Sequence, residues 1–220
     1  AGCNPSAWLY LALGVNNKGV VTREHGQAWA QMVNALNRLV SADLWWVGRF
    51  WIYGALDAEP SWNTPQATRA WVAGYTEAAD LSLGSYYLNF GSCDGCPYSA
   101  KPTLRPPNGW TLEDIWYISW GAEPALPFPE IYRNDGVNAQ QWFSVTRYGL
   151  ETYGRPMVFK GVLTTWTACQ ETKDDNCYPS PGGIDNRPME GYLQLHQALQ
   201  APPIWGYGYP RYSSDISWRR

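Results

Sequence analysis

The chain has 220 residues and a net charge of −3, with 16 basic and 19 acidic residues and no long run of either sign. This length suits one domain with a sizeable core, or a large part of a barrel that usually needs about 250 residues. The charge lacks the basic footprint of a nucleic-acid-binding protein, and no apolar stretch reaches the roughly 18 residues of a membrane span, so we expect neither partner.

The first half of the chain alternates apolar runs with helical patterns. Thr22 is placed to cap a helix that ends near Ser41, and Thr64 followed by Pro65 opens a helix that ends near Asp80. Each helix follows an apolar run that is closed by polar or turn-forming residues. Strands are therefore predicted at 7–15, 45–56 and 83–90.

The second half repeats this pattern after a long Gly/Pro/Cys loop at 91–108. The remaining elements are predicted strands at 115–121, 126–132 and 157–166 and predicted helices at 138–153, capped by Asn138, and 188–200. Repeated strand-then-helix units predict a parallel sheet with helices outside, either doubly wound or closed into a barrel. The turn at 14–19 lacks the glycine spacing of a Rossmann phosphate site. We expect an α/β fold, a (β/α) TIM-type barrel with six recognisable strands and the first one or two missing or unrecognised.

Four of the five cysteines are placed to form disulfides. Cys169 and Cys177 flank a polar loop, and Cys93 and Cys96 enclose a turn. Two disulfides indicate an oxidising compartment, so we expect a secreted or cell-surface protein. Cys3 is left over, and we expect it to pair with a segment upstream of this sequence.

The cysteines and histidines do not predict a metal site. Zinc binding would require a second ligand pair at suitable spacing, and His25 and His196 lie far from any such pattern. We therefore expect neither a metal nor another cofactor.

Tyrosine and tryptophan are unusually abundant, with 15 Tyr and 14 Trp against 5 Phe. Both side chains combine a flat apolar body with a polar edge, which suits core packing and also stacking against a sugar ring. For any single tryptophan the core remains the better interpretation.

The stretch 53–62 reads YGALDAEPSW and places two acids at the end of a predicted strand. Residues i and i+2 of a strand point to the same face, about 6.5–7 Å apart, so Asp57 and Glu59 would be presented together. The carboxyl ends of strands are where (β/α) barrels place their chemistry. The alternative is structural, since acids at strand ends also cap helices or pair with arginine.

This Asp-x-Glu element resembles the strand end of glycoside hydrolase family 25 lysozymes and of glycoside-hydrolase-like TIM-barrel domains of bacterial secreted proteins. Those lysozymes cleave the β-1,4 bond between N-acetylmuramic acid and N-acetylglucosamine. The resemblance implies that Glu59 is the general acid and Asp57 the assisting carboxylate. It extends weakly to Asn89, Trp120 and Trp166, as substrate-binding residues at later strand ends. The family's first strand bears a further essential Asp, and nothing like it precedes Trp8.

Glycoside hydrolysis needs two differently tuned acids: one protonated in an apolar setting, the other ionised. Trp51, Trp62 and Trp120 would supply the apolar setting, with Trp62 also contacting substrate. Glu123 follows the predicted strand 115–121 and is the candidate second acid. The alternative interpretation is that Glu123 is an exposed loop residue.

Two functions remain open for a single domain that spans residues 1–220 and belongs to a longer chain. The first is a glycoside hydrolase acting on peptidoglycan-like or other polysaccharide. The second is a catalytically inactive carbohydrate- or surface-binding barrel module. A third carboxylate within about 5–10 Å of the first two, facing the same cleft, would favour the hydrolase.

Overall fold

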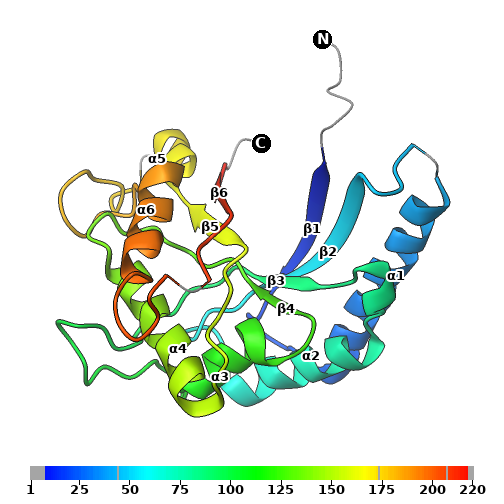
Figure 1. The fold of residues 1–220 in the computed structure, drawn as a ribbon, viewed down its shortest axis with the longest axis horizontal. Helices are drawn as coiled ribbons and strands as arrows, with labels where there is room; N and C mark the ends of the chain where they lie inside the picture. Colours follow the sequence, from blue (N-terminus) through cyan, green and yellow to red (C-terminus); the bar gives the residue numbers. More distant parts are fainter. Residues whose placement is uncertain (1–7, 44, 173, 207, 218–220) are drawn as a thin grey trace, which may run out of the picture.

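The structure is a computed structural model that describes residues 8–217 except 44, 173 and 207 (Figure 1). It has a mixed α/β fold with parallel sheets, as predicted. Its strands are β1 (Leu9–Asn16), β2 (Phe50–Asp57), β3 (Tyr87–Asn89), β4 (Ala125–Pro127), β5 (Gly161–Thr164) and β6 (Tyr212–Asp215). Its helices are α1 (Arg23–Ala42), α2 (Pro65–Ala78), α3 (Leu112–Trp116), α4 (Val137–Tyr153), α5 (Trp166–Thr172) and α6 (Pro188–Ala198), with a 3₁₀ helix η1 (Leu81–Leu83) and a π-helix η2 (Tyr117–Gly121).

The strands form two parallel sheets that are joined by the backbone after β4. One sheet has the order β1-β2-β3-β4, and the other pairs β5 with β6. Leu163 of β5 donates its N–H to the Pro129 carbonyl (2.9 Å), and Ile131 donates to the Leu163 carbonyl (2.8 Å). The six strands therefore follow one another in a single array, with the helices outside it (Figure 1). Among the described residues, β1 and β6 have no further strand partner.

The register of β1 and β2 brings the carboxyl ends of these strands level. Their pairing runs from Leu9 opposite Phe50 to Asn16 opposite Asp57. Successive side chains of a strand point to opposite faces. Tyr53 and Ala55 line the interior of the array, so Asp57 leaves β2 on that interior face.

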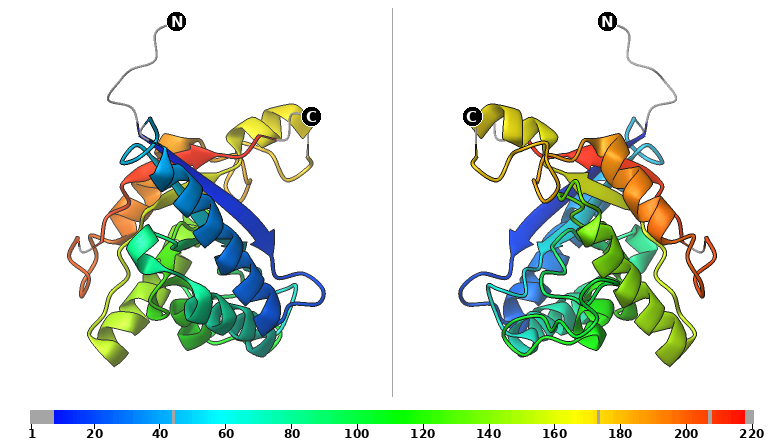
Figure 2. Two further views of the ribbon diagram at one scale, coloured as in Figure 1. Left: turned by 90° about the vertical axis from the view of Figure 1, so that its right-hand side faces the viewer. Right: turned by 90° about the vertical axis from the view of Figure 1, so that its left-hand side faces the viewer.

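Helices α1 and α2 pack side by side against the outer face of the first strands (Figure 2). Thr22 and Thr64 cap them as predicted, accepting the N–H groups of His25 and Ala67. Two glycines permit the contact, because a Cβ on Gly74 would lie 1.9 Å from the Arg23 carbonyl oxygen, and a Cβ on Gly26 would be as close to a carbonyl of α2.

Aromatic rings fill the core between α2 and β3. Trp71 stacks on Tyr75 at a centroid distance of 5.3 Å, and Tyr87 meets both rings edge-on at 5.6 and 5.1 Å. All three side chains are buried. Such pairs contribute about 0.5–1.5 kcal/mol each beyond the apolar area that they bury, so these aromatic residues are structural.

The predicted strand at 115–121 is wrong, because this segment is helical in α3 and η2. Thr111 and Asp114 form a capping box in which each side chain bonds to the other residue's backbone N–H. This start signal stabilises a helix before the apolar run, whose composition alone suits a buried helix as well as a buried strand.

Several other boundaries differ from the prediction. The predicted strand 83–90 is reduced to β3 because Gly84 adopts a left-handed conformation (φ +76°) after η1. Helix α4 ends at Tyr153 as predicted but begins at Val137, before the predicted cap Asn138. Its cap is Gly136, and Asn138 accepts backbone hydrogen bonds from Tyr132 and Arg133. The predicted strand 157–166 is shortened to β5, and α5 and β6 were not predicted.

Both predicted disulfides are present. Cys93 pairs with Cys96 and Cys169 pairs with Cys177. These bonds are consistent with an extracellular protein. Cys3, expected to pair upstream, lies outside the described residues. Within the described part of the chain, no helix is long and apolar enough to cross a membrane.

Because of the Gly74 contact, we expect a substitution that normally stabilises a helix to lower the stability of this protein. Alanine normally stabilises a helix interior by about 1 kcal/mol relative to glycine. We expect Gly74→Ala to destabilise the protein by about 1–3 kcal/mol instead, because its methyl group would collide with backbone of α1 rather than with a side chain that can move. Chemical denaturation checks this.

Gln66→Ala is the matched control, since residue 66 is exposed in the first turn of α2. It should change the free energy of unfolding by no more than about 0.5 kcal/mol. A Gly74→Ala protein as stable as the wild type would show that α1 and α2 are not in this close contact.

Candidate active site

Three carboxyl groups meet at the carboxyl ends of the strands. Asp57 ends β2, Glu59 follows it by two residues, and Glu130 lies three residues after β4. One carboxylate oxygen from each residue lies within 4.8 Å of those of the other two. The structure thus brings Asp57 and Glu59 together, as predicted, and adds a third acid.

Asn17, the residue after β1, fixes the backbone of Glu59. The Asn17 side chain accepts the Glu59 N–H (3.0 Å) and donates to the Glu59 carbonyl (3.1 Å). It also donates to the Thr68 hydroxyl of α2 (3.1 Å), and it is fully buried. Asn17 therefore holds the acidic turn between the end of β1 and the helix that follows β2.

The loop after β3 binds the Glu59 carboxylate. Ser92 donates its backbone N–H (3.0 Å) and its hydroxyl to the two carboxylate oxygens of Glu59. Gly91 makes this approach possible, because a Cβ at that position would lie 2.2 Å from the Ala58 carbonyl oxygen. The Glu59 side chain is consequently held in one orientation, although it makes no ion pair among the described residues.

Glu130 is placed by the segment that joins the two sheets. Its backbone pairs with Leu163 of β5, and its N–H donates to the Gly91 carbonyl (3.3 Å). Its carboxyl group accepts a hydrogen bond from the Tyr132 hydroxyl (2.7 Å). The third acid is therefore fixed by contacts between residues that are distant in the sequence.

Burial raises the pKa of both predicted acids, and to different values. The pKa of Asp57 rises to about 6, because its carboxyl group is desolvated and one of its oxygens is buried without a hydrogen-bond partner in the described residues. Burial raises the pKa of Glu59 to about 7, with the Asp57 and Asp94 charges acting in the same direction and the Ser92 hydrogen bonds opposing them.

Glu130 is the most strongly perturbed acid of the cluster. Burial raises its pKa well above the ordinary value, and the neighbouring Glu59 charge raises it further, whereas the hydrogen bond from Tyr132 opposes the shift. Glu130 therefore holds its proton more tightly than an exposed glutamate does. Asp94 lies nearby, and burial raises its pKa too, against the attraction of Arg133.

Asn89 does not reach the carboxyl cluster. It pairs with Leu56 across the sheet and so faces the helices, opposite to Asp57. Its amide group donates to the Ser119 hydroxyl (2.7 Å) and accepts the Gly91 N–H (3.3 Å). Its hydrogen bonds are structural.

The predicted tryptophans occupy different surroundings. Trp120 lies in η2 rather than at a strand end, and its buried indole N–H has no partner among the described residues. Trp51 is the second residue of β2, six residues and therefore about 20 Å before Asp57, so it does not supply the apolar setting of the acids. Trp62 is 38% exposed and follows Glu59 in a tight turn. Trp166 starts α5 after β5, with the Arg187 guanidinium 4.4 Å from its ring.

Glu123 is not in the cluster. It is exposed in the turn between η2 and β4, at the amino end of that strand. Its predicted position depended on a strand at 115–121 that the structure replaces by a helix. Glu130 stands where a second acid at a strand exit was expected.

Sequence reasoning missed Glu130, Tyr132 and Ser92. For Glu130 a signal existed, because it follows the apolar stretch of β4 as Asp57 ends that of β2. For Ser92 the only signal is its place after β3, beside Gly91. Tyr132 carries no recognisable pattern, since its role depends on Glu130.

The same cluster has the composition of a site for a hard cation. Ca²⁺ and Mg²⁺ take oxygen ligands, and three carboxylates within 4.8 Å can share one ion. Protons and a cation would compete for these oxygens. Any activity measured at this site should therefore be compared with and without a chelator of divalent cations.

The raised pKa values predict that stability falls as the pH rises. The native state retains protons on Asp57 and Glu59 that the unfolded chain releases, so their contribution to stability is complete below about pH 4 and is lost through about pH 7. We expect the melting temperature to decrease between pH 4.5 and 7.5. Asp57→Asn combined with Glu59→Gln should flatten this dependence.

Thermal unfolding followed by circular dichroism across this range checks the slope. Asp135, whose pKa is lowered by Arg133, contributes with the opposite sign and mainly below pH 4, outside this range. A melting temperature that rises from pH 4.5 to 7.5 would contradict the burial of the cluster.

The comparisons with known proteins yield no match to this chain. No protein-family model matches it, and no curated protein and no solved structure matches it significantly. The interpretation of the carboxyl cluster therefore depends on its own geometry and chemistry.

Proposed function

We propose that the protein is a glycoside hydrolase that acts on peptidoglycan-like or other polysaccharide through Glu59 and Asp57. The observation that carries the proposal is the cluster of three carboxyl groups within 4.8 Å, each with a raised pKa, at the ends of parallel strands. Perturbed carboxyl groups that converge in this way are typical of active sites.

The fold that accompanies this proposal is an incomplete (β/α) barrel of the TIM type. It is supported by six parallel strands in one array, helices outside, and acids at the carboxyl ends. The likeness of the stretch 53–62 to family 25 lysozymes and related barrel domains of bacterial secreted proteins belongs to the same proposal.

Glu59 is the general acid in this mechanism. Its pKa of about 7 keeps a substantial protonated fraction near neutral pH, whereas Asp57, with a pKa of about 6, is mostly ionised there. Glu59 donates its proton to the glycosidic oxygen as the bond to the anomeric carbon breaks. Asp57 stabilises the positive charge that develops on that carbon. Water then adds to the carbon and returns a proton to Glu59.

Glu130 and Ser92 position the two reacting acids. Ser92 orients the Glu59 carboxyl group, and the raised pKa of Glu130 disfavours a further negative charge beside Asp57. Asp57 and Glu59 each place a carboxylate oxygen within 4.8 Å of the other, so both can act on the same glycosidic bond.

The rim around the acids offers surfaces for sugars. Trp62 is partly exposed directly after Glu59, and Trp166 borders a polar hollow of about 580 Å³ that also includes Asn134 and Asp185. Flat aromatic faces and planar polar groups are the usual contacts of sugar rings. A polysaccharide substrate outside the cell agrees with the two disulfides and with a secreted or cell-surface location.

The decisive substitution is Glu59→Gln, which keeps the size of the side chain but removes the proton that it donates. We expect the release of reducing ends from purified peptidoglycan, or from one of a panel of polysaccharides, to fall by about 10²–10⁴-fold. The melting temperature should be unchanged or higher, because a neutral amide replaces a buried acid.

Glu123→Gln is the matched control, since it makes the same change at an exposed acid outside the cluster. Its activity should equal that of the wild type, with and without EDTA. Binding of the polysaccharide without cleavage by the wild type would favour the inactive binding module instead. A destabilised Glu59→Gln protein with full activity would assign Glu59 a structural role.

A further inference from the structure

A second cavity lies inside the strand array. It has a volume of about 530 Å³, within the range of small-molecule sites. Residues of β1, β2, β3, β5 and β6 line it, and no acidic side chain does. Its lining includes residues of β1 and β6, the two strands without a further partner among the described residues.

Small residues on three strands leave room for the cavity between the larger side chains that line it. Closed eight-stranded barrels fill their interior with layers of branched side chains. Here β1 contributes Ala12 and Gly14, β2 contributes Ala55, and β6 contributes Ser214. The sequence thus places small residues where a packed interior would need large ones.

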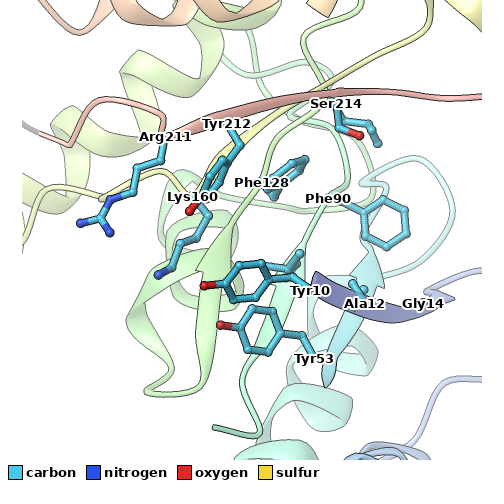
Figure 3. A pocket seen from close by; sticks show the side chains of 13 residues that line it. Tyr10, Ala12, Gly14, Tyr53, Phe90, Phe128, Lys160, Arg211, Tyr212 and Ser214 are labelled. Carbon is cyan, nitrogen blue, oxygen red and sulfur yellow. The ribbon is translucent and has the colours of Figure 1, made fainter. Parts of the chain in front are cut away.

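One end of the cavity gathers hydrogen-bond donors and positive charge. Figure 3 shows the Lys160 ammonium group and the hydroxyl groups of Tyr10 and Tyr53 on one side, with the Arg211 guanidinium group beyond them. Lys160 and Arg211 directly precede β5 and β6. Tyr10 lies near the start of β1, and Tyr53 lies in the middle of β2. Neither Lys160 nor Arg211 forms an ion pair with any described residue.

The two cations are close enough to affect each other. The pKa of Lys160 is lowered by burial and by the Arg211 charge. Burial raises the pKa of Tyr53 to about 12, so its hydroxyl group remains a donor. An oxyanion placed between these groups would relieve the repulsion and accept their hydrogen bonds.

The opposite end of the cavity is apolar. Phe90 and Phe128 lie away from the cations in Figure 3, and Leu88 and Leu163 are further apolar residues of the lining. Covering apolar surface of this kind with a ligand contributes about 25 cal/mol of favourable free energy for each Å² removed from water. The cavity is therefore amphipathic, with a cationic end and an apolar end.

We propose that this cavity binds an amphipathic anion, with the oxyanion head between Lys160 and Arg211 and an aliphatic chain against Phe90 and Phe128. A carboxylate head and a phosphate head share this chemistry. The head-group end of the site, at Lys160 and Arg211, directly precedes β5 and β6, whereas Glu59 follows β2. The proposal does not depend on the proposed hydrolase activity.

Calorimetric titration of the full chain with decanoate, decyl phosphate and decan-1-ol tests the proposal. We expect saturable one-site binding of at least one anion, with decan-1-ol at least about tenfold weaker, and the tighter anion identifies the head group. Lys160→Met and Arg211→Met keep apolar stems but remove a charge, so each should weaken binding of the anion by about tenfold and leave decan-1-ol unchanged.

Two further variants separate the cavity from general effects. Ala12→Phe should fill the cavity and abolish binding of all three compounds, whereas Lys101→Met, an exposed lysine that does not line the cavity, should bind like the wild type. Circular dichroism verifies that each variant is folded. The proposal is overturned if no anion binds, if decan-1-ol binds as tightly as the anions, or if both charge variants retain wild-type affinity. The proposal is also overturned if sedimentation shows a dimer that does not bind decanoate. That result would indicate that a second copy of the chain covers the cavity.

Discussion

The burial of three acids at one point is the constraint on which the rest of the site depends. Carboxyl groups removed from water favour their neutral form, and carboxylates within 4.8 Å repel one another. No basic side chain forms an ion pair with them in the described part of the chain. Their arrangement is held instead by neutral groups: the Asn17 amide on the Glu59 backbone, Ser92 on its carboxylate, and Tyr132 on Glu130. Hydrogen bonds of this kind fix position without neutralising charge, so the acids remain able to exchange protons.

The two ends of the strand array have opposite electrostatic character. The carboxyl ends carry Asp57, Glu59 and Glu130, and the amino ends of β5 and β6 follow Lys160 and Arg211. Because the strands are parallel, loops that leave them gather on one side and loops that enter them gather on the other. One backbone arrangement therefore offers two chemically distinct sites, and the hollow interior lies between them. The small residues Ala12, Gly14 and Ala55 lie within the regular β1–β2 pairing, which keeps the carboxyl ends of these two strands level.

Local signals predicted the first half of the fold well. Thr22, Thr64 and Pro65 start the two long helices where their capping chemistry placed them, and the spacing of Asp57 and Glu59 at a strand end predicted that they lie together. The segment 115–121 was mispredicted because an apolar, aromatic run fits either a buried strand or a buried helix. The Thr111–Asp114 capping box was the signal that distinguishes them. That one misassigned strand also led to Glu123 as the second acid.

The rest of the site depends on contacts that no local pattern encodes. Glu130 joins the cluster only because the segment after β4 pairs with Leu163 of β5, more than thirty residues later in the sequence. Asn89 ends a strand as predicted, yet a single step along β3 decides whether its side chain faces the interior or the helices. Pairing with Leu56 turns it toward Ser119, where it supports η2 instead of a ligand. Side-chain direction at a strand end is therefore set by register between strands, and a sequence predicts which residues reach the end more reliably than which face they take.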